Sequence, residues 1–158
     1  MKTLTIQQAG IDDLPFLRAM NWEAVLASPN FIAEYGLDKL RQQEDDYWPN
    51  WTPENGPSFI AVDENGQRLG AIMLKSHEPG YVPVRGWRFG IGIEAAARGQ
   101  GVGRSLIVHS LDFARNSGAR YLTLFVDPAN LPAVALYKKL GFRPVGRFGS
   151  LEEMRLEV

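Results

Sequence analysis

The hydrophobic and polar positions of this chain recur with two periods, one typical of strands and one typical of helices. Alternating or continuously apolar runs predict strands at 3–7, 58–62, 68–75, 87–93, 121–126, 145–148 and 153–158. Apolar residues at helical spacing predict helices from about 13 to 27, between 30 and 48, from about 101 to 117, and from 131 to 140. Strands and helices therefore share one chain, as in an α/β protein.

Turn residues mark where these elements end. Asp63-Glu64-Asn65-Gly66 predicts a hairpin between the strands at 58–62 and 68–75. Gly118 and Gly141 are typical of the residue that follows a helix. Three prolines and a glycine predict a loop over 49–57, and residues 76–84 read as an irregular connection.

The order of the elements predicts how the strands pair. The hairpin requires antiparallel pairing, whereas the strand-helix-strand-helix-strand run from 87 to 148 predicts a parallel pair at the centre. We therefore expect an α+β mixed sheet with helices on both faces. Gly90 and Gly92 inside a strand indicate a bulge or a close approach of another backbone. His109 falls on a polar helical stripe, so we expect a solvated surface histidine.

Composition restricts the chemistry. The 158 residues have a mass of 17.6 kDa and predict a single domain spanning 1–158. The absence of cysteine excludes disulfides, a thiolate nucleophile and zinc–thiolate sites, and two histidines are too few for a His-rich metal cluster. The pI of about 6.1 argues against nucleic acid. With no signal-peptide core and no long apolar run, we expect a cytoplasmic protein without a membrane segment or a metal.

Charge is distributed unevenly along the chain. Residues 34–54 contain six acids and two bases, a net charge of 2 − 6 = −4. Residues 85–120 contain six arginines and two acids, a net charge of 6 − 2 = +4. Such a division can steer an anion to one region and a cation to another, although solvated helix and strand faces would produce the same pattern.

A glycine-arginine segment, Arg98-Gly99-Gln100-Gly101-Val102-Gly103-Arg104-Ser105, lies at a strand-to-helix junction. Glycines there allow successive backbone N–H groups to face an oxyanion, and the helix that follows adds unpaired donors. Arg98 and Arg104 could pair with phosphate oxygens. The spacing matches neither a Walker A loop nor a dinucleotide fingerprint. The segment therefore predicts a site for a di- or polyphosphate, with tight strand–helix packing as the alternative.

The sequence resembles the GNAT superfamily of N-acetyltransferases. Arg-x-x-Gly-x-Gly, formed by Arg98, Gly101 and Gly103, is similar to that family's acyl-CoA pyrophosphate loop. A second signature, Asn…Ala…Leu-Tyr-x-x-x-Gly-Phe, runs from Asn130 to Phe142. The two occur in the expected order, and the flanking elements match along nearly the whole chain. The resemblance implies a GNAT-like fold and an acetyltransferase that uses acetyl-CoA and an amine acceptor.

The resemblance also implies roles for individual residues. The backbone of Ile91, Gly92 and Ile93 would pair with the pantetheine arm, and the amides from Gly99 to Arg104 would hold the pyrophosphate. Asn130 would contact the cofactor arm, and Tyr137 would be the general acid beside the CoA sulfur. Asn130 and Tyr137 lie seven residues apart, close to two helical turns, so they share a helix face. A helix cap for Asn130 and a core position for Tyr137 are the structural alternatives.

The residues say less about the general base and the acceptor. The strand before the glycine turn contains no carboxylate, which leaves Glu94, Glu23 and Glu34 as weak candidates for the base. Aromatic residues among the amino-terminal acids suggest a wall for a cationic amine, with core packing as the alternative: Trp22, Phe31, Tyr35, Trp48 and Trp51. A non-catalytic acyl-CoA-binding module is the alternative function, and the terminal strands allow a homodimer.

Overall fold

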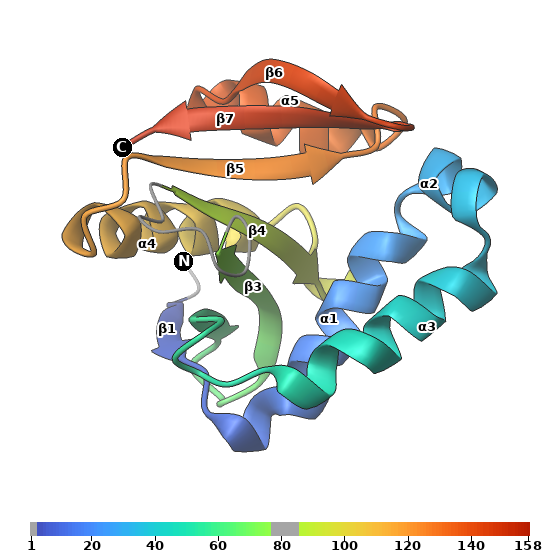
Figure 1. Ribbon diagram of the computed structural model, residues 1–158. Helices are drawn as coiled ribbons and strands as arrows, with labels where there is room; N and C mark the ends of the chain where they lie inside the picture. Colours follow the sequence, from blue (N-terminus) through green and yellow to red (C-terminus); the bar gives the residue numbers. More distant parts are fainter. Residues whose placement is uncertain (1–2, 77–85) are drawn as a thin grey trace.

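The computed structural model describes residues 3–76 and 86–158, which form one seven-stranded sheet with helices on both faces (Figure 1). The strands are β1 (Thr5–Gln8), β2 (Ser58–Val62), β3 (Arg68–Ser76), β4 (Gly86–Ile93), β5 (Tyr121–Val126), β6 (Arg143–Phe148) and β7 (Leu151–Glu157). The α-helices are α1 (Leu14–Leu26), α2 (Pro29–Tyr35), α3 (Leu37–Tyr47), α4 (Val102–Asn116) and α5 (Leu131–Leu140). Short 3₁₀ turns are η1 (Ile11–Asp13), η2 (Trp48–Asn50) and η3 (Ala95–Ala97).

Every predicted strand and helix is present, with ends that differ by a few residues. The exception is the stretch between 30 and 48, which is two helices, α2 and α3. Gly36 joins them with a φ of +81°, a left-handed backbone value that stops a right-handed helix. The irregular connection predicted over 76–84 lies, beyond Ser76, outside the described residues.

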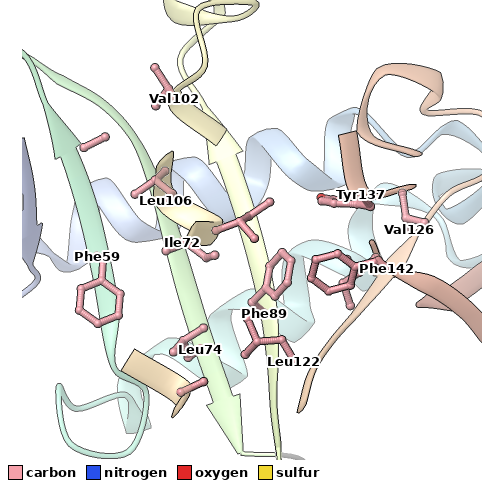
Figure 2. Close-up of a cluster of buried hydrophobic side chains, with 14 of the residues drawn as sticks. Phe59, Ile72, Leu74, Phe89, Val102, Leu106, Leu122, Val126, Tyr137 and Phe142 are labelled. Carbon is pink, nitrogen blue, oxygen red and sulfur yellow. The ribbon is translucent and has the colours of Figure 1, made fainter. Parts of the chain in front are cut away.

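Two hydrophobic clusters hold the helices against the sheet. On one face, α1 and the Trp48 turn pack on β2 and β3 through Leu17, Met20, Trp48, Ile60 and Met73. On the other face, α4 packs on the alternate side chains of the same strands, and Tyr137 of α5 packs against Phe89 of β4; Figure 2 labels residues of this cluster. Because successive strand residues point to opposite faces, a single sheet supplies both clusters. The predicted mixed sheet with helices on both faces is confirmed.

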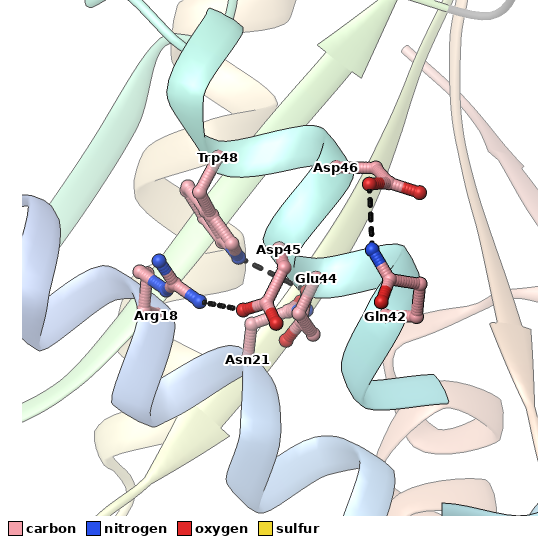
Figure 3. A network of polar contacts seen from close by, with 7 residues as sticks. All are labelled: Arg18, Asn21, Gln42, Glu44, Asp45, Asp46 and Trp48. Carbon is pink, nitrogen blue, oxygen red and sulfur yellow. Dashed lines mark hydrogen bonds and ion pairs between the residues drawn. The ribbon is translucent and has the colours of Figure 1, made fainter. Parts of the chain in front are cut away.

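A polar network joins α3 to α1 (Figure 3). One carboxylate oxygen of Glu44 accepts a hydrogen bond from Asn21 Nδ2 at 2.8 Å, and the other accepts one from Trp48 Nε1 at 3.0 Å. Glu44 is only 7% exposed, so these donors compensate for a carboxylate that is largely removed from water. Arg18 pairs with Asp45 at 2.7 Å nearer the surface.

The central strands β4 and β5 pair in parallel, as predicted, but only over a short length. Gly86, Trp87 and Arg88 lie opposite Tyr121, Leu122 and Thr123, and no further pair is formed. Beyond Arg88, β4 continues to Ile93 with β3 as its sole partner among the described strands. The two strands therefore diverge, and a gap opens in the middle of the sheet. The chain end then closes the sheet, because β7 inserts antiparallel between β5 and β6.

The glycines of β4 are explained by α1. A Cβ added at Gly92 would lie 1.9 Å from the carbonyl oxygen of Met20, and one at Gly90 would lie 3.0 Å from Asn21 Oδ1. The close backbone approach predicted from these glycines is therefore found, and the approaching backbone belongs to a helix. It sets the position of α1 against the diverging part of β4.

The prediction of a solvated surface histidine at position 109 is wrong. His109 is half-buried, and its ring lies edge-on to Phe59 with 4.7 Å between the centroids. Phe59 also contacts Phe113 on α4 at 5.3 Å. This polar residue on the helical stripe is half-buried because Phe59 of β2 packs against α4, a contact that periodicity within the helix does not indicate.

Candidate functional site

A cleft of about 610 Å³ opens where β4 and β5 diverge. Its walls come from α1, from the far half of β4, from the turn before α4, from the end of β5 and from α5. The predicted strand residues Ile91, Gly92 and Ile93 all line it. The structure therefore brings together residues up to 117 positions apart in the sequence, from Glu23 to Leu140.

The glycine-arginine turn forms one end of this cleft. Gly99 and Gly101 have φ values of +75° and +82°, a backbone conformation that favours glycine, just before α4 begins. Among the described residues, the backbone amides from Gly99 to Arg104 donate to no other part of the chain. Such a run of free N–H groups at a helix N-terminus is an anion-binding concavity. The amide of Ser105 is already used, because it donates to the Gly101 carbonyl at 3.1 Å.

The polar side chains of this turn differ in how free they are. Arg98 pairs with Glu23 at 3.1 Å and donates from Nε to the Ile93 carbonyl at 3.2 Å. Gln100 donates to the Ala96 carbonyl at 3.0 Å. Arg104 is exposed at the cleft and makes no ion pair within the described part of the chain. Arg98 thus braces the turn against α1 and β4, and Arg104 is available to an anion.

Helix α5 brings Asn130 and Tyr137 to the opposite wall of the cleft. Asn130 is the N-cap of α5, and its Oδ1 accepts from the Ala133 amide at 3.4 Å. The ring of Tyr137 is buried against Phe89 and Phe142, with centroids at 6.0 and 5.9 Å (Figure 2). Burial raises the pKa of the Tyr137 hydroxyl above its usual value. No described residue accepts a hydrogen bond from this hydroxyl.

One residue of the site, Asp127, was missed by the sequence analysis, which read it only as part of a turn. Its carboxylate is 1% exposed and accepts from the amides of Asn30, Phe31 and Ala129 at 2.7, 3.2 and 2.9 Å. Burial alone would raise its pKa, but hydrogen bonds from Ala129, Asn30 and Phe31 outweigh burial, so the pKa of Asp127 is lowered. Asp127 therefore caps the start of α2 across 97 residues of sequence.

We expect Asp127→Asn to lower the free energy of unfolding by about 2 kcal/mol at pH 7, because an amide cannot accept from all these donors. The folded pKa of Asp127 lies below the unfolded value of about 3.9. Its contribution is therefore fully present above that unfolded pKa and is lost as the pH falls through the folded pKa.

Urea unfolding of the wild type and of Asp127→Asn at pH 7 and pH 3 measures this effect. The difference between them is expected to shrink at the lower pH. Asp112→Asn is the matched control, since Asp112 is exposed and pairs only with Arg115 within its helix. An Asp127→Asn variant as stable as the control at pH 7 would contradict the assignment.

The weak candidates for the general base lie in different places. Glu23 lines the cleft and is paired with Arg98. Glu34 accepts from the backbone amide and the hydroxyl of Ser150, at 3.1 and 3.0 Å, and so ties α2 to the β6–β7 turn. Glu94 follows β4 and does not line the cleft. Only Glu23 of the three is brought to the cleft wall.

None of the five residues predicted for an aromatic wall lines the cleft. Trp48 and Trp51 are 0% and 3% exposed and belong to the core beneath α1, so their assignment to a wall is wrong. Trp22 lies under the guanidinium of Arg41 at 3.7 Å, and Phe31 contacts Tyr35 at 5.2 Å. For Trp48 and Trp51, the structure shows the alternative, which was core packing.

Within residues 3–76 and 86–158, no helix is both long and apolar enough to span a bilayer. Within the same residues, no three His, Cys, Asp or Glu side chains gather as a metal ion would require.

Comparison with known proteins places this architecture. Residues 22–142 match the model of the acetyltransferase (GNAT) family. Mycothiol acetyltransferase from Thermobifida fusca (strain YX) is 34% identical over 85% of this chain and 42% of its own length. Mycothiol acetyltransferase from Salinispora tropica is 33% identical over 89% of this chain and 44% of its own. The chain thus spans less than half the length of these relatives.

A solved structure agrees with the sequence matches. The GCN5-related N-acetyltransferase from Kribbella flavida superposes with a TM-score of 0.72 and 26% identity, covering 98% of both chains. The family match includes both the glycine-arginine turn and the helix that carries Tyr137. By this match, and by the shared fold, the chain belongs to the acetyltransferase (GNAT) family.

Proposed function

We propose that this chain is an N-acetyltransferase that moves an acetyl group from acetyl-CoA to a primary amine by direct attack. The observation that carries the proposal is the run of unpaired backbone amides from Gly99 to Arg104, which opens into the cleft between the diverging strands. Family membership and the acetyltransferase relatives support the same activity. The cleft leads from an anion-binding end to a buried tyrosine, as an extended thioester cofactor requires.

Each wall of the cleft has a part in holding the cofactor. The amides from Gly99 to Arg104 and the positive end of α4 would bind the pyrophosphate, with Arg104 adding a charged donor. The edge of β4 from Ile91 to Ile93 that faces the gap would pair with the amides of the pantetheine arm as an added strand does. Asn130 would contact the same arm from the start of α5.

The reaction needs three events at the thioester. The amine nitrogen forms a bond to the carbonyl carbon, an oxyanion forms and is stabilised by a backbone N–H of β4, and the carbon–sulfur bond breaks. The leaving thiolate takes a proton from the Tyr137 hydroxyl, and the proton lost by the amine passes to water and restores the tyrosine. A free thiol titrates near 8.5 and tyrosine near 10, so Tyr137 is protonated at neutral pH and can donate.

The acceptor must lose a proton before it attacks. A lysine-like amine with a pKa near 10.4 costs about 4.6 kcal/mol to deprotonate at pH 7, whereas an α-amine near 7.7–8.0 costs about 1 kcal/mol. An α-amine therefore needs no carboxylate base. Glu23, the candidate at the cleft, is held in an ion pair with Arg98.

Thermal unfolding with acetyl-CoA, CoA, ATP and NAD tests cofactor binding, and acetylation of an amine panel tests transfer. We expect the two CoA species to raise the unfolding temperature and the other nucleotides to have little effect. Binding without acetylation of any amine would instead favour a non-catalytic acyl-CoA-binding module. If no CoA species binds, the proposal fails.

The glycine turn offers a sharper test with a matched pair of variants. Gly101 and Gly118 have φ values of +82° and +84°, and an added Cβ would contact nothing within 4 Å at either position. Both alanine variants are thus expected to lose about 1–2 kcal/mol of stability through backbone strain. Only Gly101→Ala should weaken CoA binding, by roughly 10-fold, because it reorients the amides of the cradle. Equal CoA affinity in the two variants, measured by calorimetry, would contradict this role.

A further inference from the structure

We infer that the acceptor is a primary amine that also carries a carboxylate, as an amino acid does, and that Lys75 and Arg88 bind this carboxylate where β4 and β5 part. This inference rests on the proposed function and names the class of its acceptor. It depends on the register of β3, β4 and β5. This register places next to one another residues that belong to no common sequence motif.

The two cations lie side by side on the sheet. Lys75 on β3 is the direct cross-strand partner of Arg88 on β4. Arg88 is in turn opposite Thr123 on β5, and this is the last pair before the strands diverge. Alternation along β4 puts Arg88 on the same face as Gly90, which is the face that α1 covers. The pair therefore lies beside the cleft, on the face of the sheet that α1 covers.

Arg88 is in contact with the wall of the cleft. Its guanidinium carbon lies 5.2 Å from the ring centre of Phe125, and Phe125 lines the cleft. The next residue, Phe89, lines the cleft too and packs against Tyr137 at 6.0 Å. A carboxylate held by Arg88 thus places an amine on the adjacent carbon close to the backbone of β4, where the thioester would lie.

This pair of cations has no anionic partner in the described chain. The side chains of Lys75 and Arg88 form no ion pair or hydrogen bond there. Lys75 Nζ instead lies 4.1 Å from the ring centre of Tyr47. Desolvation by burial, followed by the charge of Arg88, lowers the pKa of Lys75 to about 8, while Glu44 acts in the opposite direction. Like charges directly opposite each other destabilise a sheet, so an anion from outside would relieve a real cost.

The local charge favours an anionic group. Lys75 and Arg88 contribute two positive charges, and Glu44 is the nearby carboxylate that offsets one of them. Glu44 accepts from Asn21 and Trp48 and forms no ion pair with either cation within the described chain. The excess of positive charge favours a carboxylate, which guanidinium and ammonium groups bind well.

Thr123 gives a second, independent observation. It is 0% exposed, and its Oγ1 has no hydrogen-bond partner within the described residues. Arg155 on β7 is the next residue in the same cross-strand row, and its Nε is likewise buried without a partner. Buried polar atoms without partners are uncommon and often mark a place for a ligand or water. The row that contains Lys75 and Arg88 therefore has spare hydrogen-bonding capacity.

Four of the six acids of 34–54 already have hydrogen-bond or ion-pair partners within the described chain. Glu34 binds Ser150, Glu44 binds Asn21 and Trp48, Asp45 pairs with Arg18, and Asp46 accepts from Gln42. Most of these contacts are visible in Figure 3. An acidic wall that binds polyamines remains the contrary outcome of the experiment below.

The experiment compares amine acceptors with and without a carboxylate. Each of the common L-amino acids is offered to the full chain with acetyl-CoA, beside its amide and with a diamine such as putrescine. We expect at least one amino acid to be acetylated with a kcat/KM about 10- to 100-fold above that of its amide. This ratio corresponds to the free energy that a hydrogen bond to a charged group contributes. Equal or better use of amides or diamines would overturn the inference.

Variants of the two cations make the test specific. Arg88→Gln and Lys75→Met are each expected to reduce kcat/KM for the amino acid by roughly 10- to 100-fold, mostly through KM, and to leave its amide within about 3-fold. Both variants should unfold at the same urea concentration as the wild type or a higher one, because a repulsive pair is removed. Arg147→Gln is the control, since Arg147 is exposed on β6 opposite Glu152 and outside this row.

The outcomes separate this inference from the proposed function. If amines are acetylated but Arg88→Gln affects the amino acid and its amide equally, only the carboxylate site is wrong. If acetyl-CoA binds and no amine of the panel is acetylated, the transferase activity itself fails and the inference fails with it.

Discussion

Tyr137→Phe is expected to lower the turnover of acetyl transfer by roughly 10²- to 10⁴-fold, the range that general acid catalysis contributes. Phenylalanine keeps the ring packed between Phe89 and Phe142 and removes only the hydroxyl. Because no described residue accepts a hydrogen bond from that hydroxyl, its loss leaves no buried group unpaired. The loss of activity should therefore appear in kcat, with CoA affinity within about 2-fold of the wild type.

The pH profile is a second readout of the same residue. Burial raises the pKa of Tyr137 above its usual value of about 10, so the hydroxyl stays protonated at all lower pH values. Turnover should thus show no fall caused by Tyr137 below about pH 10. A fully active Tyr137→Phe enzyme would remove the general acid from the mechanism while leaving the cofactor cleft in place.

Gly92→Ala is expected to cost about 3 kcal/mol or more of stability, a large part of the 5–15 kcal/mol that small domains possess. An added Cβ would lie 1.9 Å from the Met20 carbonyl oxygen and 2.6 Å from its carbonyl carbon. These are backbone atoms of α1, so no side-chain rotation relieves the overlap and the helix itself must move. Chemical denaturation measures the change.

Gly146→Ala is the matched control for this prediction. Gly146 is an exposed strand glycine on β6, and a Cβ there would approach nothing nearer than 3.7 Å. Its replacement should change stability by no more than about 0.5 kcal/mol. If Gly92→Ala were equally mild, the tight contact between α1 and β4 would not be a feature of the protein in solution.

Local signals predicted most of the elements because they depend on neighbours in sequence. The turn at 63–66, the caps at Asn130 and Gly141, and the helix that starts after Gly101 each follow from a few adjacent residues. One helical stretch was predicted between 30 and 48, where the structure has two helices, α2 and α3. Apolar periodicity continues across Gly36, whose φ is positive, so the break was not predicted. The prediction for His109 on α4 was wrong for a related reason, since the ring that packs against it belongs to Phe59 on β2.

The two motifs likewise predicted the site's chemical groups but not how they meet. Free amides at 99–104 and the facing pair Asn130 and Tyr137 are properties of a single turn and a single helix. The role of Asp127 as a cap for α2 spans 97 residues, and no local pattern at either end indicates it. Contacts of this kind depend on tertiary packing, so sequence periods do not report them.

The strands and helices, the glycine-rich turn and the helix face that carries Tyr137 follow from local sequence, because backbone freedom and helical period act over a few residues. That β7 inserts beside β5, that β4 and β5 part after Arg88, and that Lys75, Arg88 and Thr123 form one row follow from how distant segments pack. Strand register is a long-range choice, set by which side chains are buried together. The same choice places two unpaired cations beside the cleft.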